Sequence, residues 1–137
     1  MSDFLKSIAT AAQGLRAQSG RMRIISENIA NAGTTPSKPG EAPYRRKIPV
    51  FETRADSETG GIGVSLTRIR RDRSDFGQRL EPGHPAADAA GMVKTPNVDF
   101  LIEQMDMREA QRSYEANVSV ITAARRMIAR TLDILKV

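Results

Sequence analysis

Large apolar residues recur every seven positions at both ends of the chain. The N-terminal ladder consists of Met1, Ile8, Leu15, Met22 and Ile29. The C-terminal ladder consists of Phe100, Met107, Tyr114, Ile121, Ile128 and Leu135. A seven-residue period is typical of helices that wind around partner helices with a left-handed supercoil. The two ladders therefore predict terminal helices that pack against other helices.

The N-terminal helix is predicted to run from about Asp3 to Asn31. Ser2 and Asp3 supply a capping side chain and a first-turn acid, and Gly33 follows the last helical position. Small residues between the ladder positions would let another helix approach closely, while two internal glycines weaken an isolated helix by roughly 1 kcal/mol each. We expect both terminal helices to be partly disordered in the monomer and to become ordered on assembly.

The C-terminal helix is predicted from Val98 to Val137, because this stretch contains no helix breaker. Asn97 is its expected N-cap, and Asp99 complements the positive end of the helix. About 40 residues at 1.5 Å each give a helix about 60 Å long, which is longer than a domain of this size is wide. The helix is therefore expected to project or to belong to a larger assembly.

A second apolar stripe on this helix indicates more than one neighbour. Val118 and Leu132 extend the C-terminal ladder, whereas Val120, Met127 and Ile134 form a second stripe. The second stripe is rotated by about 100° from the ladder. Since one partner helix covers one ladder, we expect contact with at least two neighbouring helices.

The middle of the chain is rich in residues that break helices. All seven prolines lie between Pro36 and Pro96, and eight of the ten glycines lie between Gly33 and Gly91. Strand-like composition marks residues 44–51 (an edge or broken strand because of Pro49), 62–67 and 76–80. Residues 52–61 are a polar stretch, 70–75 a charged turn, and 83–96 are expected to be irregular. The predicted fold is mainly α, with an N-terminal helix in 1–32, a middle in 33–96 with two to four short strands, and a C-terminal helix in 97–137.

Composition excludes several kinds of site. The chain has no cysteine and a single histidine, His84, in a proline-rich loop, so we expect no metal site, cofactor or catalytic nucleophile. No apolar run approaches the ~20 residues that span a membrane, and the first residues lack the apolar stretch of a cleavable signal peptide. The net charge of +5 favours acidic partners without choosing among them.

A basic cluster is the densest charge feature. It consists of Arg68, Arg70, Arg71 and Arg73. Such residues could contact phosphates, but the cluster is flanked by acids, has no interleaved aromatic residues and lies outside any recognisable recognition helix. A solvated turn or salt links between subunits is the favoured interpretation, and we expect no nucleic-acid partner.

Two motifs, one near each end, resemble those of bacterial flagellar rod and hook proteins. The N-terminal motif is Ser26-Glu27-Asn28-Ile29-Ala30-Asn31-Ala32, followed by Thr34-Thr35 and Tyr44-Arg45-Arg46. The C-terminal motif is Pro96-Asn97-Val98-Asp99, followed by residues 103–107 and 112–117. The short length and residues 43–47 and 113–118 are most similar to C-type proximal rod proteins. The resemblance covers 1–51 and 81–137, with Gly91-Met92-Val93 where the family usually has Gly-Tyr-Val.

The resemblance implies a structural subunit of the flagellar basal-body rod, not an enzyme. Such subunits polymerise with other rod proteins and copies of themselves into the shaft that transmits motor torque to the hook and filament. They are exported unfolded by the flagellar type III apparatus, so the expected location is the periplasmic part of the basal body, reached without a cleavable signal peptide. No small-molecule substrate is implied. The alternative from a different class is a basic coiled-coil DNA-associated regulator.

The predicted subunit-interaction residues come from the ladders and the N-terminal motif. They are Ile8, Leu15, Met22, Asn28, Ile29, Asn31, Tyr44, Arg45, Arg46, Met107, Tyr114, Val118, Ile121, Ile128, Leu132 and Leu135. Two alternatives stay open. Asn28 and Asn31 could only cap the helix end and form a turn, and residues 44–47 could be an edge strand that charge protects from aggregation.

Overall fold

The computed structural model describes residues 2–57 and 60–136. The described elements are α1 (Ser2–Asn31), β1 (Lys47–Ala55), β2 (Ile62–Arg71), β3 (Gly77–Leu80), β4 (Met92–Thr95) and α2 (Phe100–Leu135). The prediction of two long terminal helices around a small β-containing middle is confirmed. Two ends of the predicted elements, Met1 and Val137, lie outside the described residues.

The chain divides into two compact units. The first unit comprises Met1–Met22, Val50–Arg68 and Arg108–Val137, and the second unit comprises Arg23–Pro49 and Ile69–Met107. Both helices, β1 and β2 contribute residues to each unit. None of the helices in the described ranges is long and apolar enough to cross a membrane.

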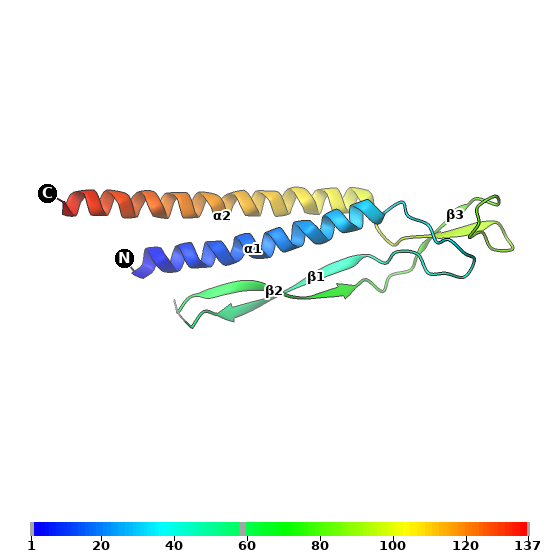
Figure 1. The fold of residues 1–137 in the computed structure, drawn as a ribbon, viewed down its shortest axis with the longest axis horizontal. Coiled ribbons are helices and arrows are strands. Elements are labelled where there is room, and N and C mark those ends of the chain that lie inside the picture. The colour runs from blue at the N-terminus through cyan, green and yellow to red at the C-terminus, as the bar shows by residue number, and fades with distance from the viewer. Residues whose placement is uncertain (1, 58–59, 137) are drawn as a thin grey trace. The chain divides into compact units, whose positions relative to one another are not determined.

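In the first unit, small residues occupy the most buried helical positions. Figure 1 shows the N-terminal part of α1 alongside the C-terminal part of α2. Ala11 and Ala17 on α1 are buried, as are Ala110 and Ala124 on α2. A Cβ at Gly14 would lie 2.9 Å from the side chain of Asn117, so only glycine fits there without a shift. Small side chains let helices approach closely, and the large ladder residues of this unit, such as Leu15 and Ile121, are only half-buried.

The β1–β2 hairpin packs on α1 within the same unit. The amide of Asp56 donates to the carbonyl of Gly61 (2.8 Å) where the chain turns back. Gln13 Nε2 on α1 donates to Asp56 Oδ2 (3.1 Å). Leu66 lies 2.8 Å from the position that a Cβ on Gly20 would take. The second glycine of α1 therefore makes room for the hairpin.

The hairpin strands extend further than the sequence predicts. β1 continues through the polar residues 52–55, beyond the predicted segment 44–51, and β2 continues through Arg70 and Arg71, which were expected in a turn. Pro49 lies inside β1 and, as predicted, in an edge strand, because the sheet has the order β1–β2. A two-stranded ribbon leaves one edge of each strand open, which tolerates both proline and charged residues.

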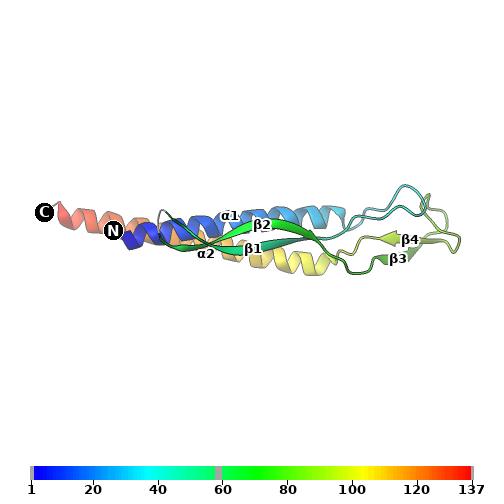
Figure 2. The same cartoon turned by 90° about the horizontal axis from the view of Figure 1, so that it is seen from below.

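In the second unit, β3 and β4 form an antiparallel pair that runs from Gly77 opposite Thr95 to Leu80 opposite Met92 (Figure 2). The prediction that residues 83–96 are irregular is wrong for β4. The connecting loop closes because Asp88 Oδ1 accepts hydrogen bonds from the amides of Ala90 and Met92 (both 2.9 Å). Hydrogen bonds to a nearby side chain leave no apolar periodicity in the sequence, so the pattern of apolar residues did not predict β4.

The start of α2 differs from the prediction. Asp99, not Asn97, is the N-cap, because Asp99 Oδ1 accepts from the amides of Leu101 (2.9 Å) and Ile102 (3.2 Å). Both asparagine and aspartate are favoured at this position, so propensity alone does not separate them. Asn97 is instead used in contacts with distant segments, described below.

Candidate functional site

A buried polar cluster joins the end of α1, the start of β1 and the start of α2 inside the second unit. It consists of Asn28, Tyr44, Arg46, Lys47, Asp72, Asn97, Glu103 and Asp106. Asn28 is 1% exposed and Glu103 is 0% exposed. Polar groups this deep in a protein are stabilising only if their hydrogen bonds are satisfied.

Asn28 uses its whole amide. Its Nδ2 donates to the carbonyl of Lys47 (2.9 Å) and to Glu103 Oε2 (3.1 Å). Its Oδ1 accepts from the Tyr44 hydroxyl (2.8 Å) and from the amide of Lys47 (2.9 Å). An amide offers two donors and two acceptor positions, and all four are filled. Asn28 thereby fixes the first residue of β1 against both helices.

Glu103 and Arg46 form the charged centre of the cluster. Arg46 Nε donates to Glu103 Oε1, and its guanidinium also lies 3.5 Å from Asp106 and 3.6 Å from Asp72. One guanidinium thus faces three carboxylates, one of them fully buried. The fixed fork of arginine suits such multiple contacts, which a lysine could not reproduce.

The environment shifts three ionisable groups. Burial, with smaller contributions from the charges of Glu27 and Glu103, raises the pKa of Tyr44 to about 12. Burial alone would lower the pKa of Arg46, but the hydrogen bond and charge of Glu103, together with the charges of Asp72 and Asp106, outweigh it, so this pKa is raised. The backbone amide of Ser74 donates to Asp72 and holds the pKa of that carboxyl below its usual range, despite opposing burial. The phenol is thereby kept neutral and the guanidinium charged.

Asn97 and Arg45 tie the segment after β2 to this cluster. Asn97 Oδ1 accepts from the amide of Arg46 (2.7 Å), and its Nδ2 donates to Ser74 Oγ (2.9 Å). Arg45 donates to the carbonyls of Asp72 (2.7 Å) and Ser74 (3.0 Å), and its guanidinium lies 4.1 Å from the centre of the Phe76 ring. These contacts hold residues 72–74 against the start of β1 and the segment before α2. No group of three or more potential metal ligands occurs among the described residues.

Comparison with known proteins decides the family. Residues 8–36 match a family model described as flagella basal body rod protein, and residues 89–134 match one described as flagellar basal body rod FlgEFG protein C-terminal. The flagellar basal-body rod protein FlgC of Agrobacterium fabrum is 52% identical, over 92% of this chain and 91% of that protein. FlgC of Bacillus subtilis is 38% identical, over 95% of this chain and 97% of that protein. The chain belongs to the FlgC family.

FlgC membership confirms the resemblance seen in the two motifs, and it makes the chain a structural subunit of the flagellar proximal rod. The comparisons give no support to a DNA-associated regulator. The two most buried polar residues fall in the two matched segments, Asn28 in residues 8–36 and Glu103 in residues 89–134. The polar cluster is therefore built from the parts of the chain that carry the family match.

In this FlgC-family chain, the predicted motif residues lie within the second unit. Asn28, Tyr44 and Arg46 meet in the polar cluster, and Arg45 lies beside it. Asn31 bonds locally, its Nδ2 donating to the carbonyl of Glu27 (2.8 Å). The structure thus uses most of these residues inside one chain, and their part in subunit contacts remains a prediction.

The predicted ladder residues are less buried than the small residues between them. Half-buried side chains belong to Ile8, Leu15, Met22, Ile29, Met107, Ile121 and Ile128. Exposed side chains belong to Tyr114, Val118, Leu132 and Leu135. The second stripe is exposed as well, with Val120, Met127 and Ile134 between 45% and 75% accessible. Much of the apolar surface of α2 is therefore free to be covered by another chain.

Sequence reasoning missed five members of the polar cluster. The predicted site residues did not include Lys47, Asp72, Asn97, Glu103 or Asp106, although the quoted C-terminal motif contains Asn97, Glu103 and Asp106. A glutamate one turn into a long helix normally reads as a solvated first-turn acid. One signal could have identified Glu103: the N-terminal motif contains a cation, Arg46, and the C-terminal motif contains an acid, Glu103, that can pair with it.

Proposed function

We propose that this chain assembles with copies of itself and with other rod proteins through the exposed apolar side of α2. Support comes from one observation: small residues fill the buried helical positions of the first unit, while seven large apolar side chains of α2 in this unit are exposed and two more, Ile121 and Ile128, are half-buried. The exposed ones are Tyr114, Val118, Val120, Met127, Leu132, Ile134 and Leu135. Exposed apolar surface of this extent is typical of interaction sites.

The assembled rod would transmit torque from the motor to the hook and filament, so the contribution of each subunit is stiffness. Covering a half-exposed Val, Met or Leu in an interface gains roughly 1 kcal/mol per side chain. Several such side chains on each subunit, repeated along a polymer, would give strong and rigid contacts. The polar cluster supports this function by holding α2, β1 and α1 in one fixed arrangement in the second unit.

Export and location complete the proposal. We infer that the chain leaves the cytoplasm through the flagellar type III export apparatus, without a cleavable signal peptide, and becomes part of the rod in the periplasmic space. It would act there without enzymatic activity. The two glycines of α1 are expected to lower the stability of this helix in isolation. Low stability suits a chain that must unfold for export and become ordered during assembly.

The test is complementation of a strain that lacks its own copy. Val120→Asp combined with Met127→Asp places charge on the exposed second stripe, and we expect loss of motility and of the chain from isolated basal bodies. Ser119→Asp combined with Thr122→Asp, exposed positions of the same helix outside the stripe, is the matched control. Both proteins should retain the circular dichroism and unfolding midpoint of the unmodified chain. Normal motility with Val120→Asp/Met127→Asp would contradict the proposed interface.

A further inference from the structure

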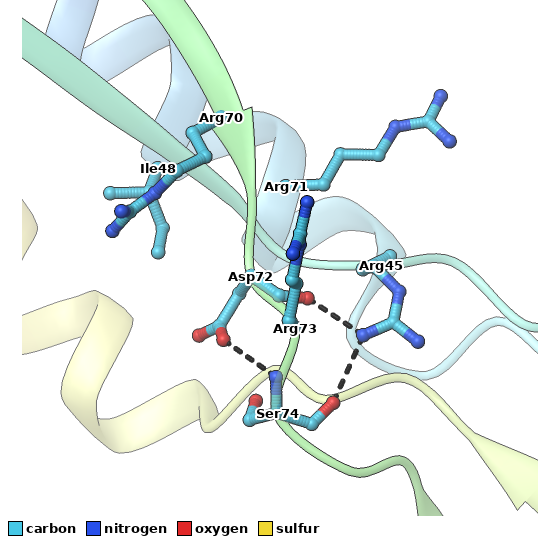
Figure 3. Close-up of a pocket in the computed structure, with 7 residues that line it drawn as sticks. All are labelled: Arg45, Ile48, Arg70, Arg71, Asp72, Arg73 and Ser74. Carbon is cyan, nitrogen blue, oxygen red and sulfur yellow. Dashed lines mark hydrogen bonds between the residues drawn. The ribbon is translucent and has the colours of Figure 1, made fainter.

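An arginine-lined cleft in the second unit borders the polar cluster. The arginine cleft has a volume of about 810 Å³ and is lined by Arg45, Ile48, Arg70, Arg71, Asp72, Arg73 and Ser74. Figure 3 shows Arg70 and Arg71 leaving the end of β2 in different directions, with Arg73 between them. The side chains of Arg70 and Arg71 thus point away from each other, although all four arginines and Ile48 contribute to the lining of this cleft.

Two of the charged groups in this cleft are already occupied. Arg45 is held by two backbone carbonyls and by the ring of Phe76. The Asp72 carboxylate lies 3.6 Å from Arg46 and accepts from the amide of Ser74 (2.9 Å). The Asp72 carboxylate is thus engaged by the polar cluster and by the turn that follows β2.

The side chains of the other three arginines form no ion pair with the described part of the chain. Arg70, Arg71 and Arg73 are exposed, and within residues 2–57 and 60–136 the structure gives none of them an ion pair or hydrogen bond through its side chain. Arg71 also lines a neighbouring cleft with Lys47 and Phe76, which extends the positive surface toward residues 42–44. Exposed charges of one sign around a concave surface raise the local concentration of ligands of opposite charge.

We propose that the arginine cleft binds a carboxylate-rich segment of a different protein in the rod. Guanidinium forks bind carboxylates through two parallel hydrogen bonds, and three unpaired forks can hold several acidic side chains. Ile48 offers an apolar contact for the aliphatic part of such a segment. The location of the partner rests on the proposed function, but the chemistry of the cleft does not.

A second copy of this chain is a poor occupant. A second copy carries the same net charge of +5, so it brings no excess of carboxylates to this cleft. The acids Glu103, Asp106 and Glu109 follow one another at three-residue intervals on α2. Arg46 of the same chain pairs with the first two, and Arg21 pairs with Glu109. The partner must therefore supply an excess of carboxylates that this sequence lacks.

Nucleic acid and lipid fit the cleft less well. Binding of single strands relies on aromatic side chains that stack on bases, and the nearby Phe76 ring is covered by Arg45. A membrane surface is flat, whereas the arginines border a concave surface. Peptide carboxylates, which can enter a cleft one side chain at a time, match the geometry best.

The test uses fluorescein-labelled decaglutamate and fluorescence anisotropy with the full chain. We expect Arg70→Gln/Arg71→Gln/Arg73→Gln to weaken binding by about tenfold, the sum of three exposed charge contacts. The matched control is Arg125→Gln/Arg126→Gln/Arg130→Gln, which removes the same charge from exposed positions of α2. The control should change the affinity by less than about twofold. Circular dichroism checks that both variants fold.

Two results would overturn the inference. One is an equal loss of decaglutamate binding in both triple variants, which would mean attraction by net charge alone. The other is stronger dependence on the same three arginines for a labelled oligonucleotide or for phosphatidylglycerol vesicles than for decaglutamate. Neither result depends on rod assembly, so failure here is distinguishable from failure of the motility test on Val120 and Met127.

Discussion

The substitution Arg46→Met tests whether the polar cluster holds the second unit together. Arg46 is the cation that faces the buried carboxylate of Glu103, and Met preserves much of its aliphatic length. After the substitution, Glu103 retains the hydrogen bond from Asn28 but loses its counter-charge. A buried charge left without its partner is among the few changes that cost a protein several kcal/mol.

The magnitude follows from the unequal burial of the two partners. Removing one partner of a buried pair costs about 3–5 kcal/mol, and Glu103 is fully buried, so we expect Arg46→Met in this range. Glu103→Gln should cost less, about 1–2 kcal/mol, because Arg46 is 23% exposed and keeps Asp72 and Asp106. In the double variant the buried charge is gone, and the cost should fall about 1–3 kcal/mol below the sum of the single variants.

The assay is urea unfolding of the four proteins, followed by far-ultraviolet circular dichroism at a concentration where the chain is monomeric. Hydrogen exchange measured by mass spectrometry assigns the loss to peptides within residues 23–49 and 69–107. Arg79→Met is the matched control in the same unit, because it breaks the exposed pair of Arg79 and Glu81 (3.0 Å). Exposed pairs contribute little, so this control should shift the unfolding free energy by less than about 1 kcal/mol.

Two results would refute this reasoning. If Arg46→Met destabilises no more than Arg79→Met, the carboxylate of Glu103 is not held by Arg46 in solution. If the single effects of Arg46→Met and Glu103→Gln add without coupling, the two residues act independently. Either outcome would also remove the polar cluster as the device that fixes α2 against β1.

Two further predictions concern pH and helix contact. Because the pKa of Tyr44 is raised to about 12, the unfolded chain loses the phenolic proton first, and stability should fall as pH rises from about 10 to about 12. Tyr44→Phe should flatten this alkaline slope in thermal unfolding, and an unchanged slope would argue against burial of the hydroxyl. Gly14→Ala should lower the midpoint of thermal unfolding, because the added Cβ would clash with Asn117. In Gly14→Ala/Asn117→Ala the clash is removed, and the midpoint should return toward that of the unmodified chain. If the double variant stays destabilised, contact with Asn117 is not the cause.

Apolar periodicity was sufficient to predict where the helices lie in the sequence, but not which side of each helix is buried. The seven-residue ladders located α1 and α2 to within a few residues, because helix length and apolar spacing are local properties. They did not show which side of each helix the chain itself covers. Besides Ile24 and Ile25, the most buried helical residues include Ala110, Ala124 and Asn28, and these last three lack the size or hydropathy that a search for apolar ladders detects.

Strand β4 and the polar cluster lay beyond the reach of the sequence for a related reason. Both depend on hydrogen bonds between residues that are distant in the chain or held by local turns, such as Glu103 with Asn28 or Met92 with Asp88. Apolar periodicity carries no information about such partners. Only the family motifs marked Asn28, Tyr44 and Arg46 as special, and they did so without indicating that the residues meet inside one chain.

The division between small and large apolar residues connects the fold to polymerisation. A chain that placed its large ladder residues in its own interior would gain stability as a monomer but would leave little apolar surface for neighbours. Here the interior of the first unit is lined by residues such as Ala11 and Ala124, while Val120 and Met127 stay accessible. The polar cluster then matters more, since a small interior gives little specificity and a satisfied buried network can fix one arrangement of helices. The same sequence can thus be marginally stable as a free chain and become rigid once another subunit covers the exposed apolar stripe of α2.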